Sequence, residues 1–163
     1  MSSDQIGNRF ATLTFDRTVA APVATLYAAW ISPAARAVWA SPAPSVTVEF
    51  LEADTRVGGR EVSLCKVAGE PDIRVEGGWL DLSPETRTVG YEVVSKEGER
   101  QSAALVTADF AAEGEASQIR VTVQLSSLTE DMAEGYRQGF NAGVDNLRAV
   151  AERTMLLQRV IKA

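Results

Sequence analysis

Histidine is absent from the sequence, and cysteine occurs once, at Cys65. Without an imidazole group, the protein has no Ser-His-Asp or Cys-His catalytic arrangement and no histidine-ligated zinc or iron. A single cysteine excludes an internal disulfide and a cysteine-ligated metal or iron–sulfur centre. We therefore expect no metal and no cofactor, and the cysteine content favours a reducing, cytoplasmic location.

Positive charge is also in short supply. The chain has 16 Lys and Arg residues against 22 Asp and Glu residues, which gives a formal net charge of -6. Nucleic acids and anionic membranes attract proteins mainly through Lys and Arg, so we expect no nucleic-acid partner. The uncharged residues 18–35 are rich in alanine and contain Pro22 and Pro33, so we expect no membrane span.

What remains is the composition of an ordinary globular domain. The chain has 163 residues, of which 45% are hydrophobic and 23% charged. This length and this composition are typical of a single domain. We expect one domain over residues 10–157, preceded by a flexible N-terminus at residues 1–9 and followed by a tail at residues 158–163.

The order of the periodic segments predicts an α+β fold. Residues 10–19 alternate as a strand does, and two short helices are predicted at residues 21–30 and 33–39. A long C-terminal helix is indicated by apolar side chains that recur every three or four residues, namely Tyr136, Phe140, Val144, Leu147 and Ala151. Six further strands with short, turn-forming connections, typical of an antiparallel meander, are predicted at residues 46–52, 59–67, 73–82, 88–95, 101–111 and 118–125.

Several local motifs resemble those of one known group of proteins. They are residues 15–30 (FDRTVAAPVATLYAAW) followed by Ser32-Pro33, residues 56–60 (RVGGR), residues 75–82 (VEGGWLDL), residues 104–110 (ALVTADF), and Gly139-Phe140 with Asp145-Asn146-Leu147. Over about residues 10–152, the order of these motifs resembles the START-like (SRPBCC) helix-grip superfamily. The branch with the greatest resemblance is that of the AHSA-like proteins, named after the activator of heat-shock-protein-ninety ATPase.

The resemblance implies a curved, seven-stranded antiparallel sheet wrapped around the long C-terminal helix, with two short helices after the first strand. In this superfamily the space between sheet and helix is often a hydrophobic cavity that holds a lipid, steroid or polyketide-like ligand. Relatives include ligand carriers, cyclases, dehydratases and protein-interaction domains. Many catalytic members use a cavity histidine, which this chain lacks.

The apolar faces of the expected elements predict the lining of such a cavity. Trp39 and Trp79 lie where a wall or mouth is expected, although large aromatic side chains also fill cores. On another strand, Val89, Tyr91 and Val93 form the apolar face. The full set of predicted ligand-binding residues is Trp39, Arg60, Leu64, Trp79, Tyr91, Phe140, Val144 and Leu147.

Arg60 is the candidate polar anchor in this set. It alternates with Val62 and Leu64, so its guanidinium could share a concave face with apolar neighbours and orient a ligand carboxylate or phosphate. A salt bridge to a carboxylate such as Glu61 or Glu76 is the simpler account.

A stripe of glycines marks the C-terminal helix. Gly135, Gly139 and Gly143 are spaced four residues apart, and each costs about 0.5–1 kcal/mol relative to alanine in a helix. Close approach of another backbone is the commoner reason for such a stripe. Room for a ligand is the alternative.

Three functions follow from these patterns. The first is non-catalytic binding of a small hydrophobic, lipid- or polyketide-like ligand between the sheet and the C-terminal helix. The second is a protein-interaction or cochaperone-like module, which could be a homodimer, with a filled core and an exposed apolar patch. The third is a cyclase- or hydrolase-like enzyme that uses carboxylates and Tyr91, and it requires a titratable group with a shifted pKa in the pocket.

Overall fold

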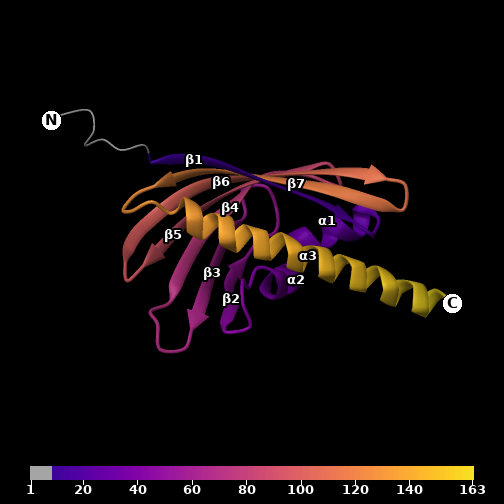
Figure 1. Ribbon diagram of the computed structural model, residues 1–163, viewed down its shortest axis with the longest axis horizontal. Coiled ribbons are helices and arrows are strands. Elements are labelled where there is room, and N and C mark those ends of the chain that lie inside the picture. Colours follow the sequence, from indigo (N-terminus) through magenta and orange to yellow (C-terminus); the bar gives the residue numbers. More distant parts are fainter. Residues whose placement is uncertain (1–8) are drawn as a thin grey trace.

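The computed structural model describes residues 9–163 (Figure 1). One strand and two short helices come first, six strands follow, and a long helix ends the chain. The elements are β1 (Phe10–Val19), α1 (Val23–Ile31), α2 (Pro33–Trp39), β2 (Val46–Ala53), β3 (Arg60–Val67), β4 (Ile73–Ser83), β5 (Arg87–Lys96), β6 (Glu99–Glu113), β7 (Ala116–Ser127) and α3 (Ala133–Lys162).

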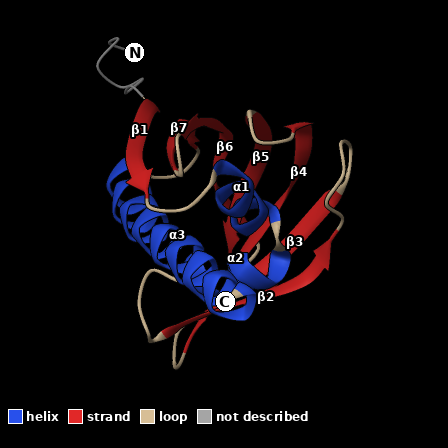
Figure 2. Cartoon of the chain, turned by 90° about the vertical axis from the view of Figure 1, so that its right-hand side faces the viewer, coloured by secondary structure: helices blue, strands red, loops and turns tan. Residues whose placement is uncertain are grey.

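These seven strands form one antiparallel sheet in the order β1-β7-β6-β5-β4-β3-β2. Strands β2 to β7 are a meander of neighbours, whereas β1 returns to pair with β7 in a register that places Phe15 opposite Val121. The sheet curves around the helices, and α3 crosses its concave face (Figure 2). The predicted α+β helix-grip fold is thus confirmed.

Glycines shape the approach to β3. Gly58 has a φ of 81°, a backbone conformation that L side chains rarely adopt. A Cβ atom at Gly59 would lie 2.0 Å from the backbone oxygen of Asp54, so no side chain fits there either. Both residues must therefore be glycine for the chain to bend into β3 as it does.

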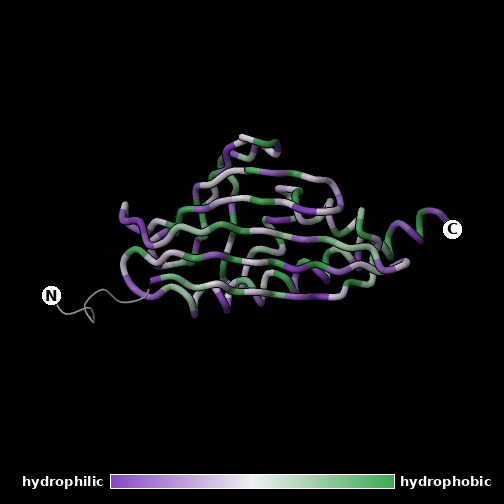
Figure 3. The backbone as a smooth tube through the Cα atoms, turned by 90° about the horizontal axis from the view of Figure 1, so that it is seen from above, coloured by the Kyte–Doolittle hydropathy of each residue, from purple (hydrophilic) through white to green (hydrophobic). Residues whose placement is uncertain are grey.

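The hydrophobic core lies on one side of the concave space, where β1, β6 and β7 meet α1 and α3. Along these strands, buried apolar side chains alternate with exposed polar ones, a pattern visible along the strands in Figure 3. The largest side chains with less than 2% exposure include Leu26, Val121, Val123, Val144 and Leu147. Burial of this apolar stripe holds α3 on the sheet.

Helix α3 continues beyond the sheet. It runs to Lys162, so the tail predicted at residues 158–163 is helical except for Ala163, and its last turns project past the strands (Figure 1). The flexible N-terminus predicted at residues 1–9 lies, apart from Arg9, outside the described residues. Within residues 9–163, no helix combines the length and the apolar character that crossing a membrane requires.

Candidate functional site

A cavity of about 430 Å³ lies between the sheet and the N-terminal half of α3. Helices α1 and α2, strands β2 to β6 and one face of α3 contribute to its wall. The larger apolar side chains of the lining are Trp30, Trp39, Val48, Phe50, Ile73, Val75, Trp79, Val94, Val106, Met132 and Phe140. Its polar side chains are Arg36, Glu61, Ser63, Cys65, Glu92 and Tyr136, with Tyr91 also in the lining.

The glycine stripe of α3 keeps this space open. Gly135, Gly139 and Gly143 all belong to the lining. A Cβ atom added at Gly135 or Gly139 would meet no atom within 4 Å, and one at Gly143 would only touch Trp39, at 3.8 Å. The close backbone packing expected for the stripe is therefore not the reason for the first two glycines. The missing side chains of these two glycines leave room in the cavity instead.

Aromatic rings build the wall at the α1–α2 end. Trp30 and Trp39 stack with their ring centres 5.1 Å apart. Each indole nitrogen is already satisfied by the protein, since Trp30 Nε1 donates to Thr88 Oγ1 and Trp39 Nε1 to the carbonyl oxygen of Ala29, both at 2.9 Å. These rings therefore present apolar faces rather than hydrogen-bond donors to the cavity.

An ion pair closes the side of the cavity next to α2. Arg36 Nη1 lies 2.6 and 2.7 Å from the two carboxylate oxygens of Glu61, and Trp79 Nε1 donates to the same carboxylate at 2.9 Å. The Arg36 guanidinium also lies over the rings of Phe50 and Trp79, at 4.9 and 5.2 Å from their centres. Opposite charges cancel here, so this corner carries no net charge.

A second carboxyl, that of Glu92, belongs to the same lining. Burial raises its pKa, while a hydrogen bond from Tyr136 and the positive charge of Arg36 act in the opposite direction. Burial and the Glu92 charge raise the pKa of Tyr136. Burial, and secondarily Glu92, also raise the pKa of the Cys65 thiol. The cavity thus favours neutral forms of all three groups.

Tyr136 links Glu92 to the core. Its hydroxyl lies 2.9 Å from Ser102 Oγ, which is fully buried, and it also hydrogen-bonds the Glu92 carboxyl. The Tyr136 ring stacks on Phe140, which in turn stacks on Phe15 with centres 5.6 Å apart. These contacts hold the hydroxyl at the boundary between the filled core and the cavity.

The structure brings together half of the residues predicted from the sequence. Trp39, Trp79, Tyr91 and Phe140 belong to the cavity lining. The other four do not. Val144 and Leu147 are 1% and 0% exposed and pack in the core, and Leu64 and Arg60 are likewise absent from the lining.

Arg60, the candidate anchor, forms the kind of salt bridge that was the simpler account of this residue. Its guanidinium is half exposed and pairs with Glu52 at 2.7 Å and with Glu76 at 3.6 Å. On β3 the lining residues are Glu61, Ser63 and Cys65, one position out of phase with Arg60 and Leu64. The charged groups at the cavity are instead Arg36, Glu61 and Glu92, none of which was among the predicted site residues.

Strand β5 shows the same phase difference. Thr88, Gly90, Glu92 and Val94 face the concave side, whereas the apolar alternation had pointed to Val89, Tyr91 and Val93. Thr88 is fully buried beneath Trp30, and Glu92 contacts Tyr136 of α3. Tyr91 is 46% exposed, and its ring lies against Gly78, its partner in the register. In the sequence, the only indication of this inward face was a polar residue, Glu92, between two apolar residues, Tyr91 and Val93.

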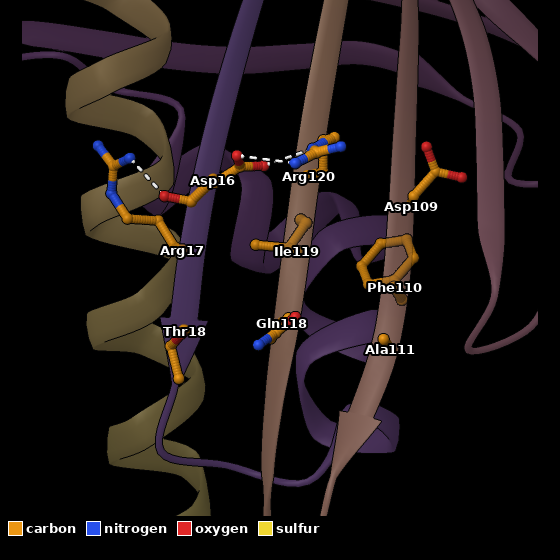
Figure 4. Close-up of a pocket in the computed structure, with 9 residues that line it drawn as sticks. All are labelled: Asp16, Arg17, Thr18, Asp109, Phe110, Ala111, Gln118, Ile119 and Arg120. Carbon is orange, nitrogen blue, oxygen red and sulfur yellow. Dashed lines mark hydrogen bonds and ion pairs between the residues drawn. The ribbon is translucent and has the colours of Figure 1, made fainter.

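A second hollow, of about 520 Å³, lies on the exposed face of β1, β7 and β6 (Figure 4). Its charged side chains are already paired, with Arg120 on Asp16 at 2.7 Å and Arg87 on Asp109 at 2.6 Å. In the part of the chain that the structure describes, no cluster of three metal-ligating side chains occurs. We therefore place the candidate site in the cavity beneath α3.

A curved antiparallel sheet around a long C-terminal helix, with a cavity between them, defines the helix-grip class of proteins. A family model described as activator of Hsp90 ATPase homolog 1-like protein matches residues 20–152, and the chain belongs to this family. No curated protein matches the chain.

Solved structures of similar proteins share the fold. The Mll3558 protein from Rhizobium loti is 26% identical, with a TM-score of 0.78 over 86% of this chain and 96% of that one. An uncharacterized protein from Rhizobium leguminosarum is also 26% identical, with a TM-score of 0.78 over 88% of this chain and 95% of that one. Protein CV1439 from Chromobacterium violaceum is 24% identical, with a TM-score of 0.74 over 87% of this chain and 98% of that one. At this identity the similarity supports the fold alone.

Proposed function

We propose that the protein binds a small hydrophobic ligand in the cavity between the sheet and α3, without changing it chemically. The observation that carries this proposal is the space at Gly135 and Gly139, which both line the cavity and where an added Cβ atom would meet no atom within 4 Å. Helical glycines are costly, so a cavity maintained by two of them calls for a functional reason.

The size and chemistry of the cavity support the same function. Its volume of about 430 Å³ falls in the range of roughly 300–1,000 Å³ that small-molecule sites occupy. Most of its lining is aromatic or aliphatic, so burial of apolar ligand surface, at about 25 cal/mol per Å², supplies the driving force. This is also the use that the superfamily resemblance implies.

Filling the cavity tests the proposal. The uncharged fluorescent probe phenylnaphthylamine is titrated into the wild-type protein and into the Gly139→Leu variant. We expect binding to the wild type and at least tenfold weaker binding to the variant, because the new side chain occupies the ligand space. Gln138→Leu, one position away on the exposed face of the helix, is the matched control and retains wild-type affinity.

Native mass spectrometry of freshly purified protein complements the titration, since a reproducible adduct of a few hundred daltons identifies the ligand. Equal probe affinity in Gly139→Leu and wild type, with both proteins folded, contradicts the proposal. So does a wild-type protein that neither carries an adduct nor takes up the probe.

The third function considered from the sequence, acid–base catalysis, has one observation in its favour. Glu92 is a carboxyl with a raised pKa inside the cavity, next to the Tyr136 hydroxyl, as a general acid requires. The tyrosine next to this carboxyl is Tyr136, and not Tyr91, which the sequence had suggested. Conversion of an extracted ligand by wild type, and not by Glu92→Gln, supports this candidate over simple binding.

The interaction module also has one supporting feature. The projecting end of α3 exposes the apolar side chains Leu156, Leu157, Val160 and Ile161, each by more than half of its surface. A partner protein or a second copy of the chain could cover them. Absence of both adduct and probe uptake favours this alternative, and a cytoplasmic location fits either function.

A further inference from the structure

The last turns of α3 change which side of the helix is apolar. Up to residue 155 the inward side is apolar and packs in the core; its members are Val144, Leu147, Ala151 and Met155. Continued at the same spacing of three or four residues, this inward line reaches Gln158, Arg159 and Lys162, which are polar. The stripe that holds α3 on the protein therefore ends at Met155.

Beyond Met155 the apolar side chains lie on the outer side of the helix. They are Leu156, Leu157, Val160 and Ile161, which are 57% to 82% exposed. Their spacing places them on one face of the helix, and these turns project past the strands (Figure 1). This outer face adds nothing to the core, and an exposed apolar patch of this kind marks a surface that meets a partner or a lipid.

Positive charge accompanies the outer face. Residues 153–162 contain Arg153, Arg159 and Lys162 and no aspartate or glutamate. Among residues 9–163, Arg153 and Lys162 have no acidic partner within 4 Å, and Arg159 meets only Glu115, at 3.7 Å, whose side chain is 93% exposed. Since the whole chain has a net charge of -6, this basic end belongs to an otherwise acidic molecule.

Charge decides which occupant fits this face. In a symmetric dimer built on the face, each copy would bring three cations and no acid, and these like charges would repel. An anionic lipid surface supplies the missing negative charge, and its boundary between headgroups and acyl chains accepts apolar side chains. Such a surface repels the acidic remainder of the molecule, so the projecting end of α3 is the part that makes contact.

We propose that residues 153–162 dock on an anionic lipid surface. The side chains of Leu156, Leu157, Val160 and Ile161 enter the interface, and the cations contact the headgroups. The helix lies on the surface and does not cross the membrane, in keeping with its limited apolar character. None of these residues lines the cavity, so the inference goes beyond the proposed binding function and does not depend on it.

Co-sedimentation of the full chain with lipid vesicles tests the inference. One set of vesicles is phosphatidylcholine alone, and the other is equal parts of phosphatidylcholine and phosphatidylglycerol. We expect the wild type to bind the anionic vesicles at least about tenfold more tightly, and added salt to weaken this binding.

Two pairs of substitutions separate the apolar face from the rest of the surface. Leu157→Gln combined with Ile161→Gln should weaken binding to anionic vesicles about tenfold, because polar side chains no longer enter the interface. The matched control is Val38→Gln combined with Leu80→Gln, which changes two exposed apolar side chains on α2 and β4. This control should bind as the wild type does. Thermal unfolding verifies that each variant is folded.

A third pair of substitutions tests the charges. Arg153→Gln combined with Lys162→Gln should bind anionic vesicles less tightly and show a weaker dependence on salt. Equal binding of the wild type to both kinds of vesicle overturns the inference, and so does unchanged binding of the Leu157→Gln, Ile161→Gln variant. A wild-type dimer that the same variant converts to a monomer, measured by light scattering, also overturns it, because a second copy would then cover the face.

Discussion

The two halves of the concave space differ although the same sheet and the same helix bound both of them. Where β1, β6 and β7 face the middle of α3, side chains such as Phe15, Val121 and Leu147 fill the interior and are almost fully buried. Where β3, β4 and β5 face the N-terminal half of α3, Gly135 and Gly139 leave the interior hollow. The fold itself therefore does not require a cavity.

The two halves of the concave space differ in the size of the side chains on α3 and in the polarity of the inward-facing residues on the strands. The inward positions in the middle of β7 are aliphatic, with a buried serine at each end, whereas those of β3 and β5 include Glu61, Ser63, Glu92 and Gly90. Polar and small residues at inward positions lower stability relative to a filled core. The filled half is thus the part that stabilises the protein, and the hollow half is the part available for function.

The largest effect is expected in the filled half. Leu147→Ala removes a fully buried side chain, so the free energy of unfolding should fall by about 2–5 kcal/mol. Phenylnaphthylamine affinity should change little while the variant is folded, because Leu147 is not in the cavity lining. Urea denaturation and probe titration measure the two quantities. A loss of affinity without a loss of stability would contradict the division into two halves.

An intermediate effect is expected from pH in the hollow half. The pKa of Glu92 is raised in the folded protein, so between the unfolded and folded pKa values the native state binds more protons than the unfolded state. The contribution of Glu92 to stability should therefore be greatest below the unfolded pKa of about 4.3 and be lost as the pH rises through the folded pKa, by about 1.4 kcal/mol for each unit of elevation.

The comparison that isolates this contribution is the stability of Glu92→Gln minus that of the wild type, measured by urea denaturation across the pH range. This difference should grow with pH, because the variant has no carboxyl to ionise at this position. Asp16 and Asp145, whose pKa values arginines lower through hydrogen bonds, act in the opposite sense but are common to both proteins. A difference that is flat with pH argues against a raised Glu92 pKa.

The smallest effect concerns the helix face that keeps the cavity open. Gly139→Ala adds a methyl group that meets no atom within 4 Å, so it should raise the free energy of unfolding by about 0.5–1 kcal/mol through helix propensity alone. Differential scanning calorimetry measures the gain. A destabilised Gly139→Ala would indicate that the stripe is there for close packing after all.

The same division explains what the sequence could predict. On β6 and β7, the alternation of apolar residues correctly identified the inward faces, including Val106, Phe110 and Val121. That rule assumes a filled, dry interior. On β3 and β5 it pointed to Leu64 and Tyr91, because the inward face there is the more polar one.

The missed residues are those whose role depends on several elements meeting. Arg36 from α2 reaches Glu61 of β3, and Tyr136 from α3 reaches Glu92 of β5. Nothing in the local sequence around any of them indicates such a partner. The motifs that resemble the family were sufficient for the fold, since those positions shape turns and fill the core, but they did not identify the polar groups of the cavity.

The pairing of β1 with β7 has a consequence for the order of folding. Strands β2 to β7 can form from successive hairpins, but the contact of Phe15 with its partner Val121 joins distant parts of the chain, and such pairings form slowly. Helix α3 must then dock on β1 as well. The cavity is therefore closed only after α3 has been synthesised, and a bound ligand should act mainly by slowing unfolding.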